Sequence, residues 1–460
     1  MTGQGPDVCI EEILALSGDD FWSIDRAHAT RNVSAYAVRS FDEHSLIFAV
    51  PLRVLRPLLS EIPLDCRGSA GAVALIIEKI KQNAGSDPRL GPLVGRGTRF
   101  PHQFASFSEP YTLVASPAAL ACDLWHAGAR NCADASGIRL LLNGALPCPK
   151  EFSPPEVASV AETVARFCDA IAEIAYAVPA KELEAAWRST LDQQLLRDAL
   201  PELGLVSFIS DGSRLARNYT RHRCHFRTAG PKEDVNIPFT CPLELGPCEL
   251  ELPASGRTVT GLGIRRKEVF AVAGSNAQGK TTFLEGIIAG VDDHAAGDGR
   301  ELVVTVQGLS TAEALNCQLN GADVSMFFSS LPPGMRGTVR AASGMGSGSM
   351  NMASQVQQAI ERHVPLLIID EDRAAPNLLV HSCFQTTEIT PLSEILAHER
   401  RRMGETALIF AACAMDTLVA QADRIMLLDQ HVARAVDRKL FRNRVADSLE
   451  KMARDLRMGG

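Results

Sequence analysis

The feature that most constrains this chain is a glycine-rich loop placed between an apolar strand and a helix. Residues 274–281 read GSNAQGKT and match the phosphate-binding pattern G-x-x-x-x-G-K-[ST]. The five residues before the loop are apolar, and those after it have helical spacing. Gly274 and Gly279 let the backbone turn its N–H groups inward around a phosphate, and the helix adds its positive end. A chance glycine-rich turn is the alternative, but the flanking strand and helix favour a P-loop nucleotide-binding domain.

Two side chains of this loop have predicted chemical roles. Lys280 is expected to reach the β and γ phosphates of a nucleotide. The Thr281 hydroxyl is expected to ligate Mg²⁺, which bridges the same oxygens. ATP and Mg²⁺ are therefore the expected ligand and cofactor.

Length and composition indicate a folded protein with more than one domain. A chain of 460 residues exceeds what one hydrophobic core usually organises, and 46 % hydrophobic with 22 % charged residues is close to the globular average. The net charge of -8 argues against a surface wholly adapted to polyanions, so any nucleic-acid contact must be local. The twelve cysteines include no C-x-x-C pair, which disfavours a zinc ribbon or a redox dithiol.

The sequence contains no recognisable export or membrane signal. The first thirty residues are acidic and lack the basic start of a secretory signal. Nowhere do eighteen apolar residues follow one another without a charge, so we expect no transmembrane segment. An intracellular, cytoplasmic location is expected.

Four segments are predicted along the chain. They are an N-terminal extension at 1–30, an α+β domain at 31–200, a P-loop ATPase domain at 201–437 and a basic C-terminal helix or tail at 438–460. In the α+β domain, residues 34–57 have the pattern of strands and residues 71–82 that of a helix. The prolines at 154 and 155 predict the start of a long amphipathic helix that ends near residue 177, and a second helix is predicted at 181–200.

A second motif follows an apolar strand at residues 366–369. Asp370 comes directly after this strand, at the carboxyl edge of a sheet where such sites lie, and fits the residue that orders Mg²⁺. Glu371 fits a general base that aligns and deprotonates the attacking water. A surface cluster of acids is the alternative for Asp370, Glu371 and Asp372, and the apolar strand before them argues against it.

The stretch ASGMGSGSMNMASQVQQAIE, residues 342–361, resembles the signature region of ABC ATPases, which caps the γ-phosphate of the partner subunit's nucleotide. Ser347, Gly348 and Ser349 align best with its small residues. Small residues let a backbone approach a phosphate closely, and the following helix would direct its positive end to the same oxygens. A flexible Gly/Ser linker is the alternative.

Together these motifs resemble the predicted ATPases of the ABC class. The resemblance is strongest from residue 200 to residue 429. It is carried by LGLVSFISDGS, TVTGLGI, GKTTFLE, AGDGRE, ADVSMFFSSLP, the SGS of the signature, and LLIIDED followed by Asn377. The resemblance implies an α/β fold class, with a P-loop NTPase domain of the ABC-ATPase type preceded by the α+β domain. It also implies a head-to-tail homodimer that closes around two nucleotides.

The resemblance also assigns roles to individual residues. The nucleotide-binding residues that it implies are Gly274, Ser275, Asn276, Ala277, Gln278, Gly279, Lys280, Thr281 and Thr282. The catalytic residues are Lys280, Asp370 and Glu371, with Thr281 and Asp370 as the magnesium ligands. Ser347, Gly348 and Ser349 would act in trans, and Asn377 would lie in a D-loop-like segment that crosses the dimer interface.

This chain departs from the family pattern at several of these positions. Asn276 and Gln278 stand where the usual loop has a glycine and a histidine. Arg373 replaces a usual threonine after the acidic triplet, and Pro376 precedes Asn377. The generic requirements of the phosphate loop survive these changes.

Two further positions bear on hydrolysis. A standard switch histidine would fall in the stretch FAACAMD, where Cys413 lies between two alanines, so slow hydrolysis is expected. Gln307, after an apolar strand, is a candidate Q-loop residue that contacts Mg²⁺ and water. An exposed polar turn is an equally good interpretation of Gln307.

A basic segment with interleaved aromatic residues lies between residues 213 and 227. Its arginines are candidate RNA or DNA contacts, because guanidinium groups pair with phosphates while aromatic rings stack on unpaired bases. A solvated loop or a set of ion pairs with acidic residues elsewhere is the alternative. The arginines are Arg214, Arg217, Arg221, Arg223 and Arg227.

Three functions are therefore compared. The leading hypothesis is an ABC-class ATPase that binds and hydrolyses ATP with Mg²⁺ at a dimer interface and couples hydrolysis to an unknown client. The alternative is an RNA- or DNA-binding protein in which ATP is a switching or structural ligand. A P-loop kinase would need an acceptor site and a lid, which the sequence does not reveal.

Overall fold

The computed structural model describes residues 36–39, 45–62, 65–84, 86–94, 127, 131–150, 153–216, 237–382 and 388–458. Contacts among these residues divide the chain into two compact units. The first unit holds the described residues up to Gln194 together with His294–Asp298, and the second holds the others. The predicted domain limits at residues 30, 200 and 437 stay a prediction.

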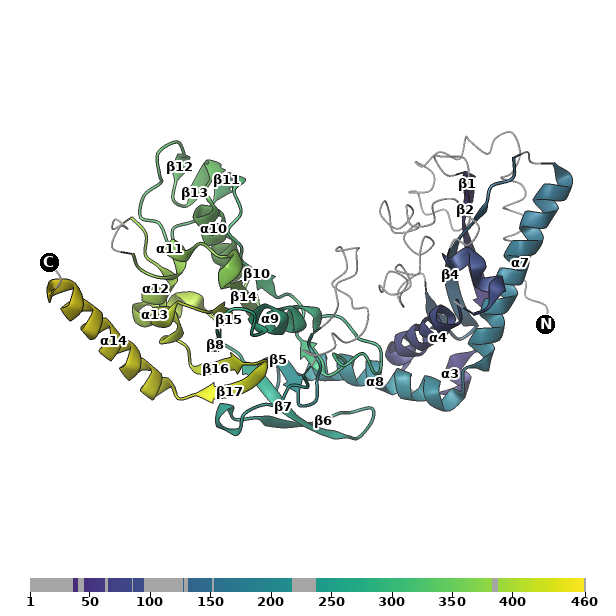
Figure 1. Ribbon diagram of the computed structural model, residues 1–460, viewed down its shortest axis with the longest axis horizontal. Helices are drawn as coiled ribbons and strands as arrows, with labels where there is room; N and C mark the ends of the chain where they lie inside the picture. Colours follow the sequence, from purple (N-terminus) through teal and green to yellow (C-terminus); the bar gives the residue numbers. More distant parts are fainter. Residues whose placement is uncertain are drawn as a thin grey trace. The chain divides into compact units, whose positions relative to one another are not determined.

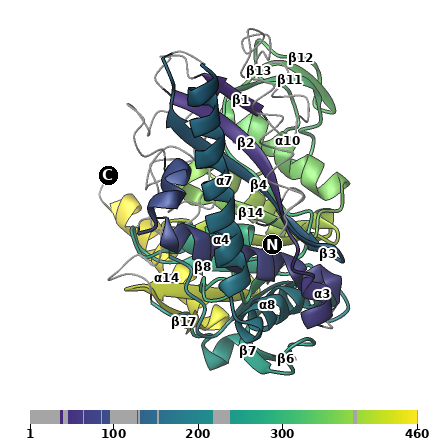
Figure 2. The same cartoon turned by 90° about the vertical axis from the view of Figure 1, so that its right-hand side faces the viewer.

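The first unit is built on an antiparallel sheet with the strand order β1-β2-β4-β3. Its strands are β1 (Tyr36–Arg39), β2 (Ser45–Val54), β3 (Cys132–Asp134) and β4 (Gly137–Pro147). Alternate residues of β2 from Leu46 to Val54 are buried, as are Ile138, Leu140 and Leu142 of β4, so one face of the sheet is apolar there. Helices α4 (Ser69–Asn83) and α7 (Pro154–Ala177) bury their apolar sides in the same core, and Figure 2 shows both beside the sheet.

Packing in this core is close where β2 and β4 pair. Phe48 stands opposite Gly144 in the strand register, and its ring meets that of Phe167 edge to face at 5.9 Å. A Cβ atom on Gly144 would lie 2.2 Å from the Phe48 ring, so only glycine leaves room there. Ser153 and Glu156 form a capping box at the start of α7. The remaining helices of this part are α3 (Leu58–Glu61), η2 (Cys66–Gly68), η3 (Pro88–Val94) and α8 (Ala180–Ala199), the last of which contributes residues to both units.

The second unit is organised by a six-stranded sheet with the order β10-β14-β15-β8-β16-β17. Figure 1 shows this sheet in the middle of the second unit. The strands pair in parallel except β17, which forms an antiparallel hairpin with β16. Their bounds are β8 (Val269–Ala273), β10 (Ser310–Thr311), β14 (Leu366–Asp370), β15 (Ala407–Ala412), β16 (Arg424–Asp429) and β17 (Val432–Val436). The central strands β8 and β15 are apolar along their whole length, as parallel strands covered on both faces are.

Each face of this sheet packs against its own core. On one face lie helix α9 (Lys280–Ala289) and an antiparallel sheet with the order β6-β7-β5-β9. The strands of that sheet are β5 (Leu205–Ser210), β6 (Cys248–Glu251), β7 (Thr258–Arg265) and β9 (Val303–Thr305), and η5 (Leu243–Leu245) precedes β6. The other face is covered by α10 (Gly348–Glu361), α11 (Pro376–Leu379), α12 (Leu392–His398) and α13 (Asp416–Val419). The predicted α/β fold, with a P-loop domain after a part that contains both sheet and helices, is confirmed.

Further elements of the second unit lie around these layers. A three-stranded antiparallel sheet with the order β11-β13-β12 is formed before α10. Its strands are β11 (Cys317–Ala322), β12 (Arg336–Thr338) and β13 (Ala341–Gly346), and the short helices are η6 (Glu371–Arg373) and η7 (Arg400–Met403). The chain continues from β17 into α14 (Arg438–Met458), none of whose residues is buried. In the part of the chain that the structure describes, no helix is both long and apolar enough to cross a membrane.

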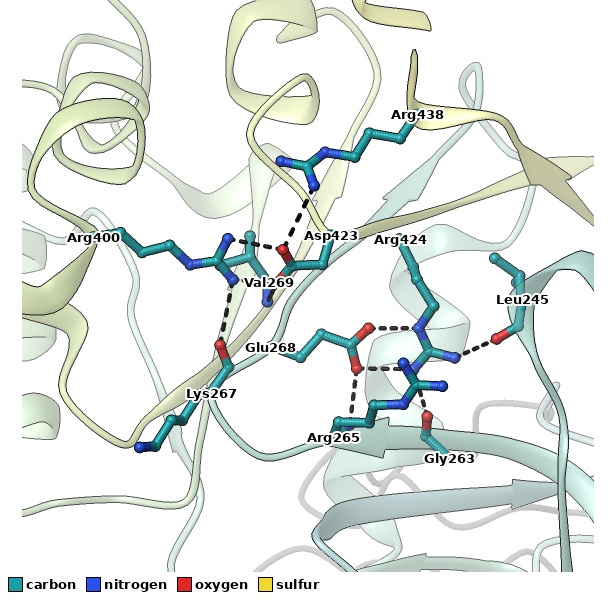
Figure 3. Close-up of polar contacts among 10 residues, drawn as sticks. All are labelled: Leu245, Gly263, Arg265, Lys267, Glu268, Val269, Arg400, Asp423, Arg424 and Arg438. Atoms are coloured by element: carbon teal, nitrogen blue, oxygen red, sulfur yellow. Dashed lines mark hydrogen bonds and ion pairs between the residues drawn. The ribbon is translucent and has the colours of Figure 1, made fainter. Parts of the chain in front are cut away.

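A polar network fixes the starts of β8 and β16, as Figure 3 shows. Glu268, directly before β8, forms an ion pair with Arg424, the first residue of β16, and both side chains are largely buried. Asp423 accepts hydrogen bonds from the Val269 N–H and from Arg400. These contacts hold the two neighbouring strands in register at the end of the sheet opposite the phosphate loop.

Candidate nucleotide-binding site

The loop from residue 274 to residue 279 joins β8 to α9. Its backbone takes left-handed dihedral angles at Gly274 (φ 151°), Ala277 (φ 61°) and Gly279 (φ 95°). Glycine adopts such angles without strain, which explains two of these three positions. A Cβ atom on Gly274 would also lie 2.6 Å from the carbonyl oxygen of Leu428 in β16. The two glycines of the motif are therefore required by the shape of the loop and by its neighbour.

Lys280 and Thr281 begin the helix and point toward the loop and the neighbouring strands. The buried Lys280 Nζ donates hydrogen bonds to the carbonyl oxygens of Gly274 (2.8 Å) and Ser275 (2.9 Å). The Thr281 Oγ1 donates to Oδ2 of Asp370 at 2.7 Å. Ser275, Asn276 and Ala277 are exposed at the tip, while Gln278, Gly279 and Thr282 are partly covered.

Asp370 reaches Thr281 although its strand β14 is not adjacent to β8, the strand that precedes the loop and α9. One strand, β15, lies between the Asp370 strand β14 and the loop strand β8. Parallel strands present their carboxyl ends at one edge, so residues that follow them meet above the sheet. Glu371 starts η6, and its Oε2 accepts a hydrogen bond from the backbone N–H of Cys413, which follows β15. The Glu371 carboxylate is thereby oriented by the strand in the middle.

Cys413 occupies the place at which the sequence lacks a switch histidine. Its thiol is exposed. This position contributes its backbone N–H, which donates to Glu371 and which any residue except proline supplies. The sequence analysis did not predict this contact. Because the donor is not a side chain, no motif reveals it.

An open cleft lies beside Thr281 and Asp370. Its empty volume, open mouth included, is about 330 Å³. Besides these two residues it is lined by Glu285, Glu313 and Arg373, with apolar side chains between them. Burial raises the pKa of Glu285, and the negative charge of Asp370 adds to this effect. Arg373 partly balances the acids through a 2.9 Å ion pair with Glu313.

Glu313, which carries no sequence motif, is placed in this cleft by the edge strand β10. Thr311 pairs with Ile368, and the Ala312 N–H donates to the Ile368 carbonyl at 3.1 Å, which brings the next residue beside Asp370. Gln355 of α10 holds the Glu313 backbone by hydrogen bonds to its N–H and C=O.

The candidate Q-loop residue Gln307 lies elsewhere. Its side chain is exposed and donates to the Val291 carbonyl, which follows α9. It is not among the residues that line the cleft, whereas Glu313 is. The Q-loop role of Gln307 stays a prediction.

The signature candidates lie at the start of α10. Ser347 is the N-cap residue of this helix but makes no side-chain cap hydrogen bond, and its hydroxyl lies 3.0 Å from that of Ser349. A Cβ atom on Gly348 would lie 3.2 Å from Ala314, so the helix start is packed closely against the segment after β10. Within the described part of the chain, no hydrogen bond or ion pair joins residues 347–349 to the loop 274–282. Ser347 is exposed, and Gly348 and Ser349 are partly exposed.

Asn377 lies in the short helix α11, which Pro376 begins. The helix is anchored beneath α10 through buried Leu378 and through the Ala375 N–H, which lies 3.4 Å from the Met352 sulfur. Asn377 itself is partly exposed. Its D-loop role stays a prediction.

Most of the predicted nucleic-acid contacts lie outside the described residues. Arg217, Arg221, Arg223 and Arg227 belong to that part of the chain. Arg214 is described and exposed, and its backbone N–H donates to the Gly299 carbonyl at 2.7 Å. The nucleic-acid interpretation stays a prediction.

The residues at this site fit a magnesium ion that is shared with a nucleotide. Mg²⁺ prefers oxygen ligands, and the Thr281 hydroxyl and the Asp370 carboxylate bring two oxygens to within 2.7 Å of each other. Among the described residues no group of three or more His, Cys, Asp and Glu side chains is placed to hold a metal alone. Mg²⁺ at phosphate sites usually takes its remaining ligands from phosphate oxygens and water.

Comparisons with known proteins found similar sequences and structures. An uncharacterized protein of Methanocaldococcus jannaschii is 39% identical over 377 residues, which cover 82% of this chain and 82% of that protein. Among solved structures, a part of an ABC transporter complex from Clostridium perfringens matches with 13% identity and a TM-score of 0.30, covering 55% of this chain and 95% of its own. An ABC transporter in an inward-facing conformation matches with 14% identity and a TM-score of 0.27, covering 42% of this chain and 81% of its own.

The family assignment rests on the sequence comparisons and not on these two distant structures. The family model ABC_ATPase, described as a P-loop domain, matches residues 179–457. This range includes the phosphate loop, Asp370, Glu371 and the start of α10, and it covers more than half of the chain. The chain belongs to the ABC_ATPase family of P-loop proteins.

Proposed function

We propose that this chain binds ATP with Mg²⁺ at residues 274–282 and hydrolyses it at a head-to-tail homodimer interface. The observation that carries the proposal is the 2.7 Å hydrogen bond from Thr281 to Asp370, with the Glu371 carboxylate held beside it by the Cys413 N–H. A hydroxyl, a carboxylate for the metal and a second carboxylate for water are the groups that P-loop hydrolysis needs.

Each residue has a role in the proposed reaction. Lys280 gives up its hydrogen bonds to the loop carbonyls and binds the β and γ phosphates instead. Its positive charge stabilises the negative charge that builds on them. Glu371 orients a water molecule in line with the γ-phosphate and accepts its proton as ADP leaves. Bound Mg²⁺, held through Thr281 and Asp370, would neutralise the phosphate oxygens.

The second half of the site would come from a partner chain. Ser347 at the start of α10 is exposed, and Gly348 and Ser349 are partly exposed. The first backbone N–H groups of a helix have no partner within the helix, so this start would bind an anion. In a head-to-tail pair this helix start would face the γ-phosphate held by the other chain. Opening of the dimer after hydrolysis would then drive an unknown client.

Replacement of Glu371 by glutamine tests the chemistry. Glu371→Gln keeps the shape of the side chain but removes the base, so phosphate release should fall at least about 100-fold. The same variant should accumulate a dimer with ATP and Mg²⁺, visible by light scattering. Asp372→Asn, at the exposed carboxylate next in the chain, is the matched control and should keep its turnover. Wild-type phosphate release no higher than that of Lys280→Ala would contradict the proposal.

Mixing two inactive variants tests the shared site. Lys280→Ala removes the nucleotide half, and Ser347→Arg blocks the signature half. In a mixed head-to-tail dimer one of the two composite sites keeps both intact halves. The mixture should therefore recover turnover that neither variant has alone, and a mixture as inactive as its parts would exclude a site shared between chains.

A further inference from the structure

The two-residue turn between β16 and β17 is built from residues that the turn does not favour. Asp429 pairs with Val432, so Gln430 and His431 alone close the hairpin. Both have left-handed dihedral angles, with φ of 50° and 66°. Such turns favour Asn-Gly or Gly-Gly, because glycine and asparagine tolerate positive φ. Non-glycine residues in this conformation are strained, and strain of this kind is concentrated at functional sites.

This turn lies directly on the phosphate loop. Strand β16 runs parallel to β8, with Leu427 opposite Ala273, so the turn follows β16 where the loop follows β8. The Gln430 N–H donates a hydrogen bond to Oε1 of Gln278. Gln278 is one of the two loop residues that depart from the usual family pattern. The loop is therefore tied to the hairpin by the Gln278 side chain.

The His431 imidazole lies beside the last glycine of the loop. Its Nδ1 is 3.3 Å from the position that a Cβ atom on Gly279 would occupy. Gly279 is the N-cap residue of α9, where backbone N–H groups and the helix dipole favour an anion. The side chain is partly exposed, and within the described residues its imidazole makes no hydrogen bond or ion pair. A ring N–H is thus free to donate at the edge of the phosphate site.

We propose that His431 is a nucleotide-binding residue that donates a hydrogen bond to the phosphate chain. This inference rests on the proposed ATP site and adds to it an imidazole from the turn that follows strand β16. In the sheet order β15-β8-β16, Cys413 follows the strand on one side of the loop strand and His431 follows the strand on the other. His431 is therefore placed to hold the nucleotide and not to replace the missing histidine at Glu371.

Glycine substitution separates a binding role from a purely structural one. His431→Gly removes both the imidazole and the strain at φ 66°, so its melting temperature should equal or exceed that of wild type. Its Kd for ATP with Mg²⁺, measured by isothermal titration calorimetry, should rise about tenfold, the loss of roughly one hydrogen bond to a charged group. Gln430→Gly relieves the neighbouring strain and keeps the imidazole. This matched control should gain stability and bind ATP within about twofold of wild type.

A conservative variant and a ligand without a base complete the test. His431→Asn tolerates the left-handed turn and keeps a side-chain N–H donor, so it should recover part of the lost affinity. Inorganic tripolyphosphate with Mg²⁺, used as a competitor of a fluorescent ATP analogue, should be weakened by His431→Gly as much as ATP is. A loss of affinity for ATP without a loss for tripolyphosphate would assign His431 to the base or ribose and overturn the phosphate contact.

The outcomes distinguish this inference from the proposed function. If wild type binds ATP, Lys280→Ala does not, and His431→Gly binds like wild type, the role of His431 is refuted while the ATP site stands. If wild type fails to bind ATP, both fall. If His431→Gly is too unstable to measure, His431→Asn is compared instead with His431→Leu, which has no side-chain donor. Equal affinity of these two folded variants for ATP would also refute the contact.

Discussion

The hydroxyl of Thr281 donates a 2.7 Å hydrogen bond to the carboxylate of Asp370, across 89 residues of sequence. The contact brings together the start of α9 and the end of β14, two strands away from β8 in the sheet order. It also creates a pair of oxygens in a geometry that a divalent cation can use. The following prediction depends on this pair.

Thr281→Val should weaken ATP binding only when Mg²⁺ is present. Valine keeps the branched shape of threonine but has no oxygen, so the metal loses one ligand while the loop keeps its backbone. We expect the Kd for ATP in Mg²⁺ to rise about tenfold or more, which is the scale of one lost charge-assisted contact. Thr281→Ser retains the hydroxyl and is the control. An equal loss of affinity with EDTA in place of Mg²⁺ would contradict the metal-ligand role.

Arg424→Ala should strongly destabilise the second unit. The guanidinium pairs with Glu268, whose side chain is only 4% exposed, and donates to the carbonyls of Leu245 and Gly263 (Figure 3). Removal of the arginine leaves a buried carboxylate without its cation, which costs about 3–5 kcal/mol in unfolding free energy. Urea unfolding followed by circular dichroism measures this loss.

Arg434→Ala is the matched control for that experiment, because Arg434 lies on the same hairpin in an exposed ion pair with Asp429. Its unfolding free energy should change by less than about 1 kcal/mol. The double variant Glu268→Gln with Arg424→Met should recover part of the stability that Arg424→Ala loses, since no buried charge is left. Equal effects of Arg424→Ala and Arg434→Ala would show that the buried pair contributes no more than a surface pair.

Asp423 predicts a dependence of stability on pH. Burial alone would raise the pKa of its carboxyl, but hydrogen bonds from Arg400 and from the Val269 N–H, with the nearby charge of Arg438, hold the pKa below its usual value. A carboxyl whose pKa is lower in the folded chain stabilises the fold above its unfolded pKa of about 3.9. This contribution disappears as the pH falls through the lower folded pKa.

Comparison of Asp423→Asn with wild type measures this contribution. The variant should be less stable at pH 7, and the difference in unfolding free energy should shrink as the pH is lowered below about 4. Asp447→Asn, at an exposed position of α14, should leave the pH profile unchanged. A difference between Asp423→Asn and wild type that stays constant down to pH 3 would contradict the lowered pKa.

Local patterns predicted the parts of the site that each lie on one segment. An apolar run, then two glycines, then helical spacing predict the strand, loop and helix of residues 269–289. The structure has the strand and the helix there. The start of the long helix near Pro154 was likewise predicted, because prolines favour the first turn of a helix. Both signals depend on neighbours fewer than ten residues apart.

The contacts that complete the site depend on sheet register, which local patterns do not encode. Strand β10 has two residues, too few for an alternating pattern, yet its pairing with β14 places Glu313 beside Asp370. Gln430 reaches Gln278 across 152 residues, only because β16 is paired with β8. A single sequence gives no sign of either pairing, so the place of Glu313 in the cleft was not predictable from it.

Gly274 shows how the sheet affects the choice of experiments. Its missing side chain gives space both to the loop backbone and to the Leu428 carbonyl of β16, 2.6 Å from where a Cβ would stand. A substitution there would push apart two paired strands as well as deform the phosphate loop. Gly274→Ala is therefore an unsuitable probe of nucleotide affinity, because a loss of affinity in this variant would combine lost ligand contacts with a distorted sheet. Substitutions of Lys280 and Thr281 change only side chains and leave the backbone in place.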